Sequence, residues 1–542
     1  MAPTLSSLAR SSALMSAGTL VSRVLGFAKA MLLAIAIGVS VGGAANAFDI
    51  ANKVPNNLYM LLAGGVLNAV LVPQIVRAMK HDDGGHRFVN RLLTLAMALI
   101  ALFTVLATLL APYIVRLYSS GSWSDEQVAL AVAFAYICLP QIFFYGLYTL
   151  LGQVLNARRS FGPYMWAPVL NNVVAILGLL AFIWIFGPGD SGQHAVGTWD
   201  PTKIGILAGS ATLGVVCQAL VLLWPLRAGG FRYRPAFGFR GVGLGTAGKV
   251  ASWTFAALLV GQAGFVVISR VAASVPAGTE VDPLPSNAAY TFAYLVFMLP
   301  HSIVAVSLVT ALFTSLSQDA ANGDLAAVRA STSLGLRTVG MCTVFATVTI
   351  MALDGPLAMV ITTRHQNEAE VMSNVLTFMV LGLVPFSANY LLQRVFYAYE
   401  DARTPFWIQL PQVVLTTLGV LWAGTMPDRV VVAYIGLAMS AGYLLAMLLS
   451  CVFVLRRIGN FGLGQAVRAH VKYLVAGVLA LLVGVVLRIL VGPGAWDDKG
   501  SAFLMVAWIG PVMLAVYLGM CWLMRVREIR MIVDAVRTKV GR

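Results

Sequence analysis

Charged and amide side chains recur at helical spacing inside stretches of this chain that are otherwise apolar. Asn46, Asp49, Lys53 and Asn56 follow one another at steps of three and four, so a helix would carry them on one face. Asp49 and Lys53 are four residues apart and can form an ion pair on that helix. Such a row inside an apolar helix is typical of a face that lines a cavity.

Basic residues outnumber acidic residues within these stretches. Arg23, Lys29 and Arg270 have no obvious acidic partner in the membrane, and an arginine fork suits phosphate. We therefore expect a central cavity that binds an anion. Its expected binding residues are the basic and amide side chains Arg23, Lys29, Lys53, Arg270, Asn46 and Asn56. In the alternative interpretation, the cations reach the membrane interface or pair with acids such as Asp324 and Glu400.

Two prolines lie within apolar stretches that carry polar residues. Pro55 and Pro300 each remove a backbone hydrogen bond and are expected to kink a helix. Together with Asp49 and Lys53, they are expected to gate the cavity or to balance its charge between two states. A static bend is the alternative interpretation of the prolines.

The composition indicates which elements must carry these residues. Of 542 residues, 59% are hydrophobic and 11% are charged, whereas a soluble domain is about 45–50% apolar and about 25% charged. This excludes a water-soluble enzyme and a disordered chain. We expect an all-α integral membrane protein with about 14 transmembrane helices. The expected spans are 11–38, 47–76, 92–115, 128–155, 164–187, 204–226, 250–274, 287–316, 325–352, 371–397, 404–424, 430–455, 471–492 and 502–524.

The basic residues predict the orientation of the spans. The net charge of +15 would suggest nucleic acid for a soluble protein, but here the cations concentrate in and near loops. If the N-terminus is cytoplasmic, both tails and the even-numbered loops, with the adjoining parts of the spans, hold 25 of the 36 Lys and Arg, and the odd-numbered loops with their adjoining parts hold six. The positive-inside rule then places both termini in the cytoplasm. No nucleic-acid partner is expected.

An internal repeat divides the chain. Residues 21–24 recur at 268–271, 247 positions later, and Pro55 recurs as Pro300, 245 positions later. These matches predict two six-helix lobes in parallel orientation, related by a pseudo-twofold axis along the membrane normal, plus two further C-terminal helices. The expected domains are 1–240 for the N-lobe, 241–457 for the C-lobe, and 458–542 for the last two helices and a basic tail.

The sequence offers no catalytic or metal-binding constellation. Residues 243–249 match glycine-rich phosphate loops, but Val250 stands where the Mg²⁺-binding hydroxyl would be, and a spanning helix follows. The six histidines are scattered, and we interpret them as exposed loop residues, with His301 as the one within a span. We expect no enzymatic activity, no metal and no cofactor. Coupling to Na⁺ or H⁺ is left open, without identified ligands.

Short motifs along the whole chain resemble those of one family. They lie at 22–29, 46–48, 53–56 and 396–405. Together they resemble the MurJ (MviN) lipid II flippase family of the multidrug/oligosaccharidyl-lipid/polysaccharide exporter superfamily. The resemblance implies a cavity between two lobes in which basic residues grip the lipid II pyrophosphate. It also implies a hydrophobic groove beside the last two spans for the polyprenyl tail.

The family's functional residues carry over in part. Arg23, Lys53, Pro55 and Asn56 match the family directly, and Lys29 replaces a second arginine, which keeps the charge but loses the bidentate fork. Other positions lack the family's charged residues: Ala30, Asn46, Tyr59, Met60, Gly64 and Leu295. We hypothesise that Arg270 and Asp49 substitute for them.

From this resemblance we expect a flippase in the bacterial plasma membrane that moves lipid II from the inner to the outer leaflet by alternating access. The membrane potential or an ion gradient would drive it. The expected partners are lipid II, membrane lipid and cell-wall synthesis proteins, and a monomer is expected. The alternatives are a cation-coupled multidrug exporter, another polysaccharide-lipid flippase, and a non-transporting scaffold of the cell-wall machinery. An exporter predicts an acidic cavity, and a scaffold predicts replaceable intramembrane cations.

Overall fold

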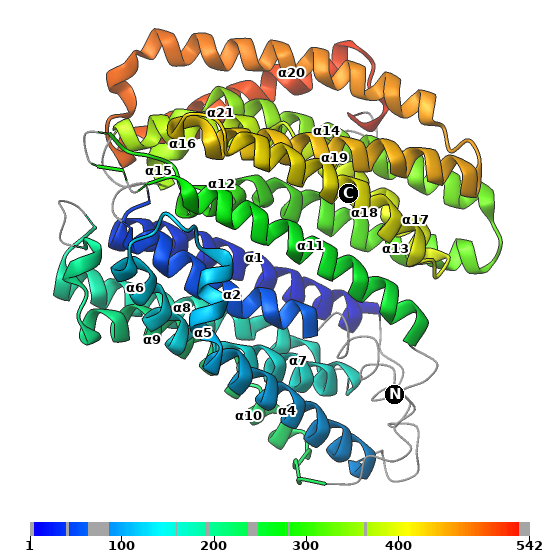
Figure 1. Cartoon of the computed structure of the whole chain (residues 1–542). Helices are drawn as coiled ribbons and strands as arrows, with labels where there is room; N and C mark the ends of the chain where they lie inside the picture. Colours follow the sequence, from blue (N-terminus) through cyan, green and yellow to red (C-terminus); the bar gives the residue numbers. More distant parts are fainter. Residues whose placement is uncertain are drawn as a thin grey trace. The chain divides into compact units, whose positions relative to one another are not determined.

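The structure is a computed structural model in which helices form nearly all of the described chain (Figure 1). It describes residues 5–39, 43–62, 86–158, 160–189, 194–236, 248–276, 278–279, 282–361 and 366–529. The chain divides into two compact units, residues 1–277 and 278–542. Gly64 and most of the glycine-rich motif at 243–249 lie outside the described residues.

The first unit contains the helices from α1 to α11. Their bounds are α1 Leu5–Ile37, α2 Ala44–Leu62, α4 His86–Leu109, α5 Ala111–Tyr118, α6 Asp125–Cys138, α7 Gln141–Ala157, α8 Phe161–Phe186, the 3₁₀ turn η2 Val196–Thr198, α9 Pro201–Leu220, α10 Leu223–Ala228 and α11 Gly248–Ser274.

The second unit contains the helices from α12 to α21. Their bounds are α12 Asn287–Pro300, the π-helical turn η3 His301–Ala305, α13 Val306–Ala321, α14 Leu325–Ala352, α15 Asp354–Ile361, α16 Gln366–Val380, α17 Leu383–Ala398, α18 Arg403–Ala423, α19 Asp428–Ile458, α20 Leu463–Val491, the 3₁₀ turn η4 Pro493–Trp496 and α21 Lys499–Leu523.

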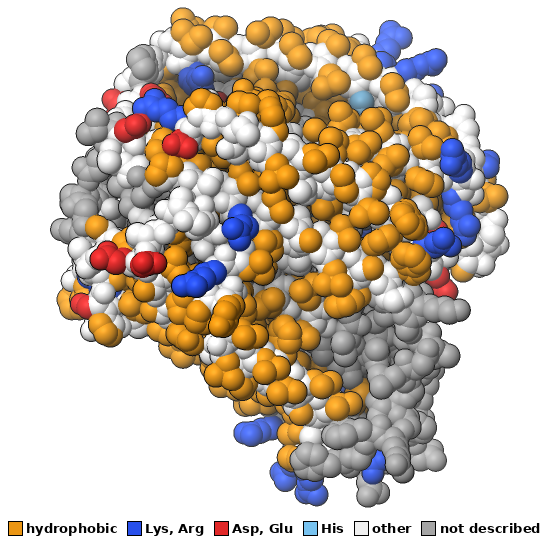
Figure 2. All heavy atoms as spheres, in the orientation of Figure 1, with side chains coloured by type: hydrophobic (Ala, Val, Ile, Leu, Met, Phe, Trp, Pro, Cys, Tyr) orange, Lys and Arg blue, Asp and Glu red, His pale blue; other side chains and the backbone are white. Residues whose placement is uncertain are grey.

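The described helices confirm the expected membrane architecture. Thirteen segments are long and apolar enough to cross a membrane, and each coincides with one of the fourteen expected spans. The remaining span, 47–76, begins in α2 and continues beyond the described residues. Figure 2 shows apolar side chains over much of the visible surface, which is the surface that a lipid environment favours.

Polar residues just outside the spans fix where several helices begin. Ser124, Asp200 and Asp324 each accept a hydrogen bond from a backbone N–H in the first turn of the helix that follows. Asp498 forms a reciprocal capping box with Ser501 at the start of α21. Because these side chains satisfy N–H groups that have no partner inside the helix, the loop sequence sets the beginning of each span.

The two units repeat an unusual order of helices. In the first unit, a break at Leu110 separates α4 from the eight-residue helix α5, and in the second, Leu353 separates α14 from the eight-residue helix α15. Breaks near Pro140 and Pro385 then divide the next span of each unit into α6–α7 and α16–α17. This shared order supports a duplicated six-span element.

The boundary between the compact units falls later than the expected lobe boundary at 240. The unit boundary follows residue 277, so α11 groups with the first unit. Two hydrogen bonds explain this grouping: Trp123 Nε1 donates to the Ala273 carbonyl at 2.8 Å, and Ser269 Oγ donates to the Tyr118 carbonyl at 3.0 Å. The seventh span therefore packs on α5 and its following loop, although the repeat places it at the start of the second copy.

Candidate functional site

The polar face of α2 carries an ion pair. Lys53 Nζ lies 2.7 Å from Asp49 Oδ2, as the spacing of four predicts. The side chain of Lys53 is 25% exposed and that of Asp49 is 13% exposed, so solvent can still reach the pair. Lys53 also lies 5.9 Å from the centre of the Phe265 ring on α11. This pair is therefore held between two helices of the first unit without being sealed from its surroundings.

The other expected residues of α2 differ in their burial. Asn46 is buried and Asn56 is exposed, although the spacing predicts one face for both. Pro55 is buried within the helix. In the next turn the Tyr59 hydroxyl is hydrogen-bonded to Thr149 of α7. The polar row of α2 thus begins in the interior of the first unit and ends at its surface.

Lys29 projects into a small cavity inside the first unit. The cavity has a volume of about 70 Å³, and Asn52, Gln141, Tyr145 and Asn171 contribute polar groups to its lining. None of its described lining residues is acidic, and Lys29 makes no ion pair among the described residues. A cation in such a site is costly unless an anion or water compensates it.

Hydrogen bonds hold the polar wall of this cavity in place. Gln141 Nε2 donates to Thr212 Oγ1 at 2.9 Å and to Asn52 Oδ1 at 3.4 Å, and the Tyr145 hydroxyl donates to Gln141 Oε1 at 3.3 Å. Asn171 Nδ2 completes the wall by donating to a side chain of α9 at 2.7 Å. These hydrogen bonds join α2, α7, α8 and α9, so the amides of the wall are fixed relative to one another.

Close packing against α8 sets the rotation of α1. The Asn172 amide donates to the Ser22 carbonyl at 2.8 Å, and a Cβ at Gly18 would come within 2.9 Å of Trp166 Nε1. Arg23 and Lys29 are six residues apart, which on a helix separates their directions by roughly 120° and their positions by about 9 Å. Arg23 is only half-buried and forms no ion pair among the described residues.

Arg270 lies near the C-terminal end of α11, on the surface. Its Nη1 donates to the Arg116 carbonyl at 3.4 Å, and the residue is exposed. It stands four residues before the end of its helix, whereas Lys29 stands eight before the end of α1. Of Arg23, Lys29 and Arg270, only Lys29 is among the described lining residues of the cavity.

Pro300 marks a local change of helix type in the second unit. It ends α12, and the π-helical turn η3 follows directly. His301 is buried, its Nδ1 lies 2.9 Å from Ser387 Oγ on α17, and its ring packs on Phe386 at 4.5 Å. Turns of this type frequently occur at functional sites. Pro300 thus stands beside a buried polar contact between two broken helices.

The interpretation of the histidines as exposed residues is wrong for His194. This residue follows α8 in the chain and is 5% exposed, with Phe182 and Trp199 around its ring and its Nε2 3.3 Å from the Gly187 carbonyl. Burial lowers the pKa of His194, and the charge of Lys203 lowers it further. A loop position in the sequence did not reveal that aromatic residues enclose this ring.

Comparison with known proteins decides the family. The family model described as "Lipid II flippase MurJ" matches residues 25–507. This chain belongs to that family. The MurJ match covers the expected spans completely except for the first half of the first and most of the fourteenth.

Three curated relatives from the MurJ family match this chain with similar identity and over similar shares of both chains. A probable lipid II flippase MurJ of Buchnera aphidicola is 26% identical over 406 residues, covering 74% of this chain and 75% of the relative. The relative from Rhizobium meliloti is also 26% identical, covering 74% and 72%. The lipid II flippase MurJ of Burkholderia cenocepacia is 27% identical over 411 residues, covering 74% and 75%.

Solved structures confirm the fold. The structure titled "Lipid II flippase MurJ, inward closed conformation" aligns with a TM-score of 0.73 at 19% identity, covering 95% of this chain and all of the other. An inward-facing multidrug resistance MATE transporter of the MOP superfamily aligns with a TM-score of 0.65 at 16% identity, covering 81% and 95%. The chain is therefore a multi-pass membrane protein with the fold that MurJ shares with MATE transporters.

Sequence reasoning missed most of the wall around Lys29. Asn52, Gln141 and Asn171 lie on three different spans, and no spacing rule brings them together. The sequence does show that each is an amide side chain within an apolar span, and such a side chain needs a hydrogen-bonding partner. The MurJ resemblance alone did not place any of them.

Proposed function

We propose that this protein is a flippase that carries lipid II from the inner to the outer leaflet of the bacterial plasma membrane by alternating access. The observation that carries this proposal is the match of residues 25–507 to the lipid II flippase MurJ family. The relatives that share about a quarter of their residues with this chain are named for the same substrate.

The charges of the first unit support an anionic substrate. Lys29 lines a cavity without an acidic residue among its described lining, and Arg23 is half-buried without an ion pair there. A cavity for cationic drugs would need the opposite charge. Within a fold shared with multidrug transporters, this basic character favours a diphosphate-bearing lipid over a cationic drug.

The proposed roles divide by position. Lys29, Arg23, Lys53 and the amides of Asn46 and Asn56 would contact the substrate or its water shell, and Arg270 would attract the anion near the end of α11. Asp49 would neutralise Lys53 when the substrate is absent. Pro55 and Pro300 would allow their helices to bend between states. No chemical bond changes in this cycle, so we propose no enzymatic step.

The test is replacement of the native flippase in cells. A bacterium depleted of its own MurJ should grow when this chain is expressed, and labelled lipid II should become accessible to an impermeant reagent outside the cell. Growth without external lipid II would support a scaffold. Export of cationic dyes without rescue would support a drug exporter.

The energy source and the assembly state are parts of the same proposal. The membrane potential or a gradient of Na⁺ or H⁺ would drive transport, since moving one charge through 100 mV is worth about 2.3 kcal/mol. Collapsing only the potential with valinomycin and K⁺, or only the H⁺ gradient with nigericin, separates these sources. The proposed active form is a monomer, which mass photometry of the purified protein tests.

The proposed orientation places both termini in the cytoplasm. It follows from the excess of Lys and Arg in alternate loops. Cysteines introduced at the exposed residues Thr425 and Asn460, which lie at opposite ends of α19, distinguish the two orientations in a background without native cysteines. An impermeant maleimide added to intact cells should label position 425 and spare position 460.

A further inference from the structure

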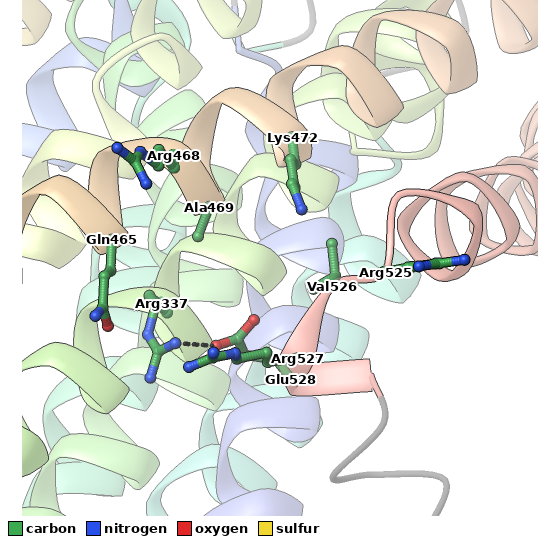
Figure 3. A pocket seen from close by; sticks show the side chains of 9 residues that line it. All are labelled: Arg337, Gln465, Arg468, Ala469, Lys472, Arg525, Val526, Arg527 and Glu528. Carbon is green, nitrogen blue, oxygen red and sulfur yellow. Dashed lines mark ion pairs between the residues drawn. The ribbon is translucent and has the colours of Figure 1, made fainter.

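A basic pocket lies at one end of the second unit, between α14, α20 and the turn that follows α21 (Figure 3). Its volume is about 260 Å³. Five of its lining side chains are basic and one is acidic: Arg337, Arg468, Lys472, Arg525, Arg527 and Glu528. This end of the unit carries the loop that is expected to face the cytoplasm.

The one carboxylate among the described lining residues of the pocket already has a cationic partner. Glu528 is 4% exposed, and its Oε1 lies 3.1 Å from Arg337 Nη1. The buried Tyr473 hydroxyl donates to its other oxygen at 2.9 Å. Figure 3 shows the Arg337–Glu528 ion pair among the side chains that line the pocket. Both carboxylate oxygens of Glu528 therefore already have partners, and Glu528 does not neutralise the other cations of the pocket.

Four basic side chains remain without an acidic partner among the described residues. Arg468 and Lys472 stand one turn apart on α20. Lys472 Nζ donates to the Met524 carbonyl at 2.8 Å, which orders the turn after α21. That turn passes through the left-handed backbone of Arg525, with φ of 54°, and brings Arg527 beside Glu528. Like charges held this closely favour a bound anion.

The surface beside the pocket indicates that the anion belongs to a membrane lipid. Beside Lys472 and along the next turns of α20 lie four apolar residues that are each more than half exposed: Val471, Leu474, Val475 and Val478. Trp522, one turn before Arg525, is 64% exposed, and tryptophan is enriched at membrane interfaces. The pocket therefore sits where an apolar, lipid-facing strip ends and basic side chains begin.

We propose that this pocket binds the phosphate headgroup of an anionic membrane phospholipid, with its acyl chains along the exposed strip of α20. The phosphate would contact the exposed guanidinium groups of Arg468 and Arg527 and the ammonium of Lys472. A basic pocket between transmembrane helices at the cytoplasmic side has the chemistry that such headgroups require. This site is separate from the Lys29 cavity and concerns regulation or anchoring by lipid, whatever the transported substrate is.

The test uses the full-length protein in a neutral detergent. Its unfolding temperature is measured during titration with short-chain phosphatidylglycerol, short-chain phosphatidylcholine or inorganic phosphate. We expect saturable stabilisation by phosphatidylglycerol only. The variant Arg468→Gln/Arg527→Gln should weaken the apparent affinity roughly 30-fold, because each cation near an anionic surface contributes about 1 kcal/mol.

The matched control is Arg456→Gln/Arg457→Gln, which removes the same charge from exposed residues at the end of α19. Its affinity for phosphatidylglycerol should equal that of the unchanged protein. Arg527→Gln alone serves if the double variant does not purify, since Arg527 is exposed. Equal stabilisation by phosphatidylcholine, stabilisation by inorganic phosphate alone, or unchanged affinity of the Arg468 and Arg527 variants would overturn the proposal.

Discussion

Lys53 Nζ lies 2.7 Å from Asp49 Oδ2 on the same face of α2, and both side chains remain partly exposed. The carboxylate of Asp49 neutralises the charge of Lys53, so a cation is stabilised on a membrane-spanning helix. Substrate phosphate could take the place of that carboxylate without moving the backbone, because the two residues stand one turn apart.

Removing either partner of this pair should cost more than removing both. Asp49→Asn and Lys53→Gln each leave one charge without its partner, and we expect each to lower the free energy of unfolding by about 1–3 kcal/mol. The double variant should recover part of that loss. Thermal unfolding of the purified variants measures the stability, and complementation measures the function, which Asp49→Ala should abolish. Normal growth with Asp49→Ala would contradict the role in charge balance.

Replacing Lys29 should separate stability from function. Lys29→Met removes a cation from a cavity whose described lining contains no acidic residue, so we expect the unfolding temperature to stay equal or to rise. The same variant should fail to support growth of cells depleted of MurJ. Lys29→Arg keeps the charge and should retain more activity than Lys29→Met. If Lys29→Met supports growth, the cavity does not serve transport.

Arg270 should matter for function rather than for stability. Its side chain is exposed and donates only a long hydrogen bond to the Arg116 carbonyl among the contacts that the structure gives it. We expect Arg270→Ala to change the free energy of unfolding by less than about 0.5 kcal/mol and to abolish complementation. Arg116→Ala, at the neighbouring exposed arginine, is the matched control and should support growth. Equal growth of both variants would remove Arg270 from the proposed binding residues.

The contact between His301 and Ser387 should stabilise the second unit. Ser387→Ala leaves the buried His301 Nδ1 without this hydroxyl, and we expect a loss of about 1–3 kcal/mol. Thermal unfolding measures the change. Ser302→Ala, which deletes a hydroxyl that donates only to the Leu299 carbonyl three residues earlier, is the control and should cost less. A smaller effect of Ser387→Ala than of the control would show that η3 does not depend on this contact.

The buried His194 should make stability fall in acid. Its pKa is lowered in the folded protein, so below about pH 6.5 the unfolded chain binds a proton that the folded chain does not. Its contribution is therefore present above pH 6.5 and decreases as the pH falls through the lowered folded pKa. The unfolding temperature of His194→Gln, measured between pH 5 and pH 8, should depend less on pH than that of the unchanged protein. If the unfolding temperatures of His194→Gln and the unchanged protein depend on pH in the same way, His194 does not cause the loss of stability in acid.

The spans could be predicted because each depends on a local property of the chain. An apolar window of roughly 20 residues must be helical in a membrane, and residues such as Asp324 and Asp498 end the apolar pattern where they cap a helix. The pairing of Asp49 with Lys53 was equally local. The π-helical turn after Pro300 was not predictable in this way, since the hydroxyl that His301 contacts there, on Ser387, lies 86 positions away in the sequence.

The arrangement of the cations was harder to predict, because it depends on how each helix is rotated. Arg23 and Lys29 look alike in the sequence, yet packing of α1 on α8 turns only Lys29 into the cavity lined by Gln141. Helical geometry alone would have separated their directions, but it could not say which of them points inward. That choice depends on residues such as Ser22, Asn172 and Trp166, whose partners lie more than a hundred positions away.

The ion pair between Arg337 and Glu528 ties the chain beyond α21 back to α14. A truncation that removes Glu528 would leave Arg337 without its carboxylate partner and the hydroxyl of Tyr473 without its acceptor. A reporter or affinity tag joined directly to Leu523 would do the same damage. The residues that follow α21 therefore hold the end of this helix against α14 and α20. Truncations and tags should be placed after residue 529.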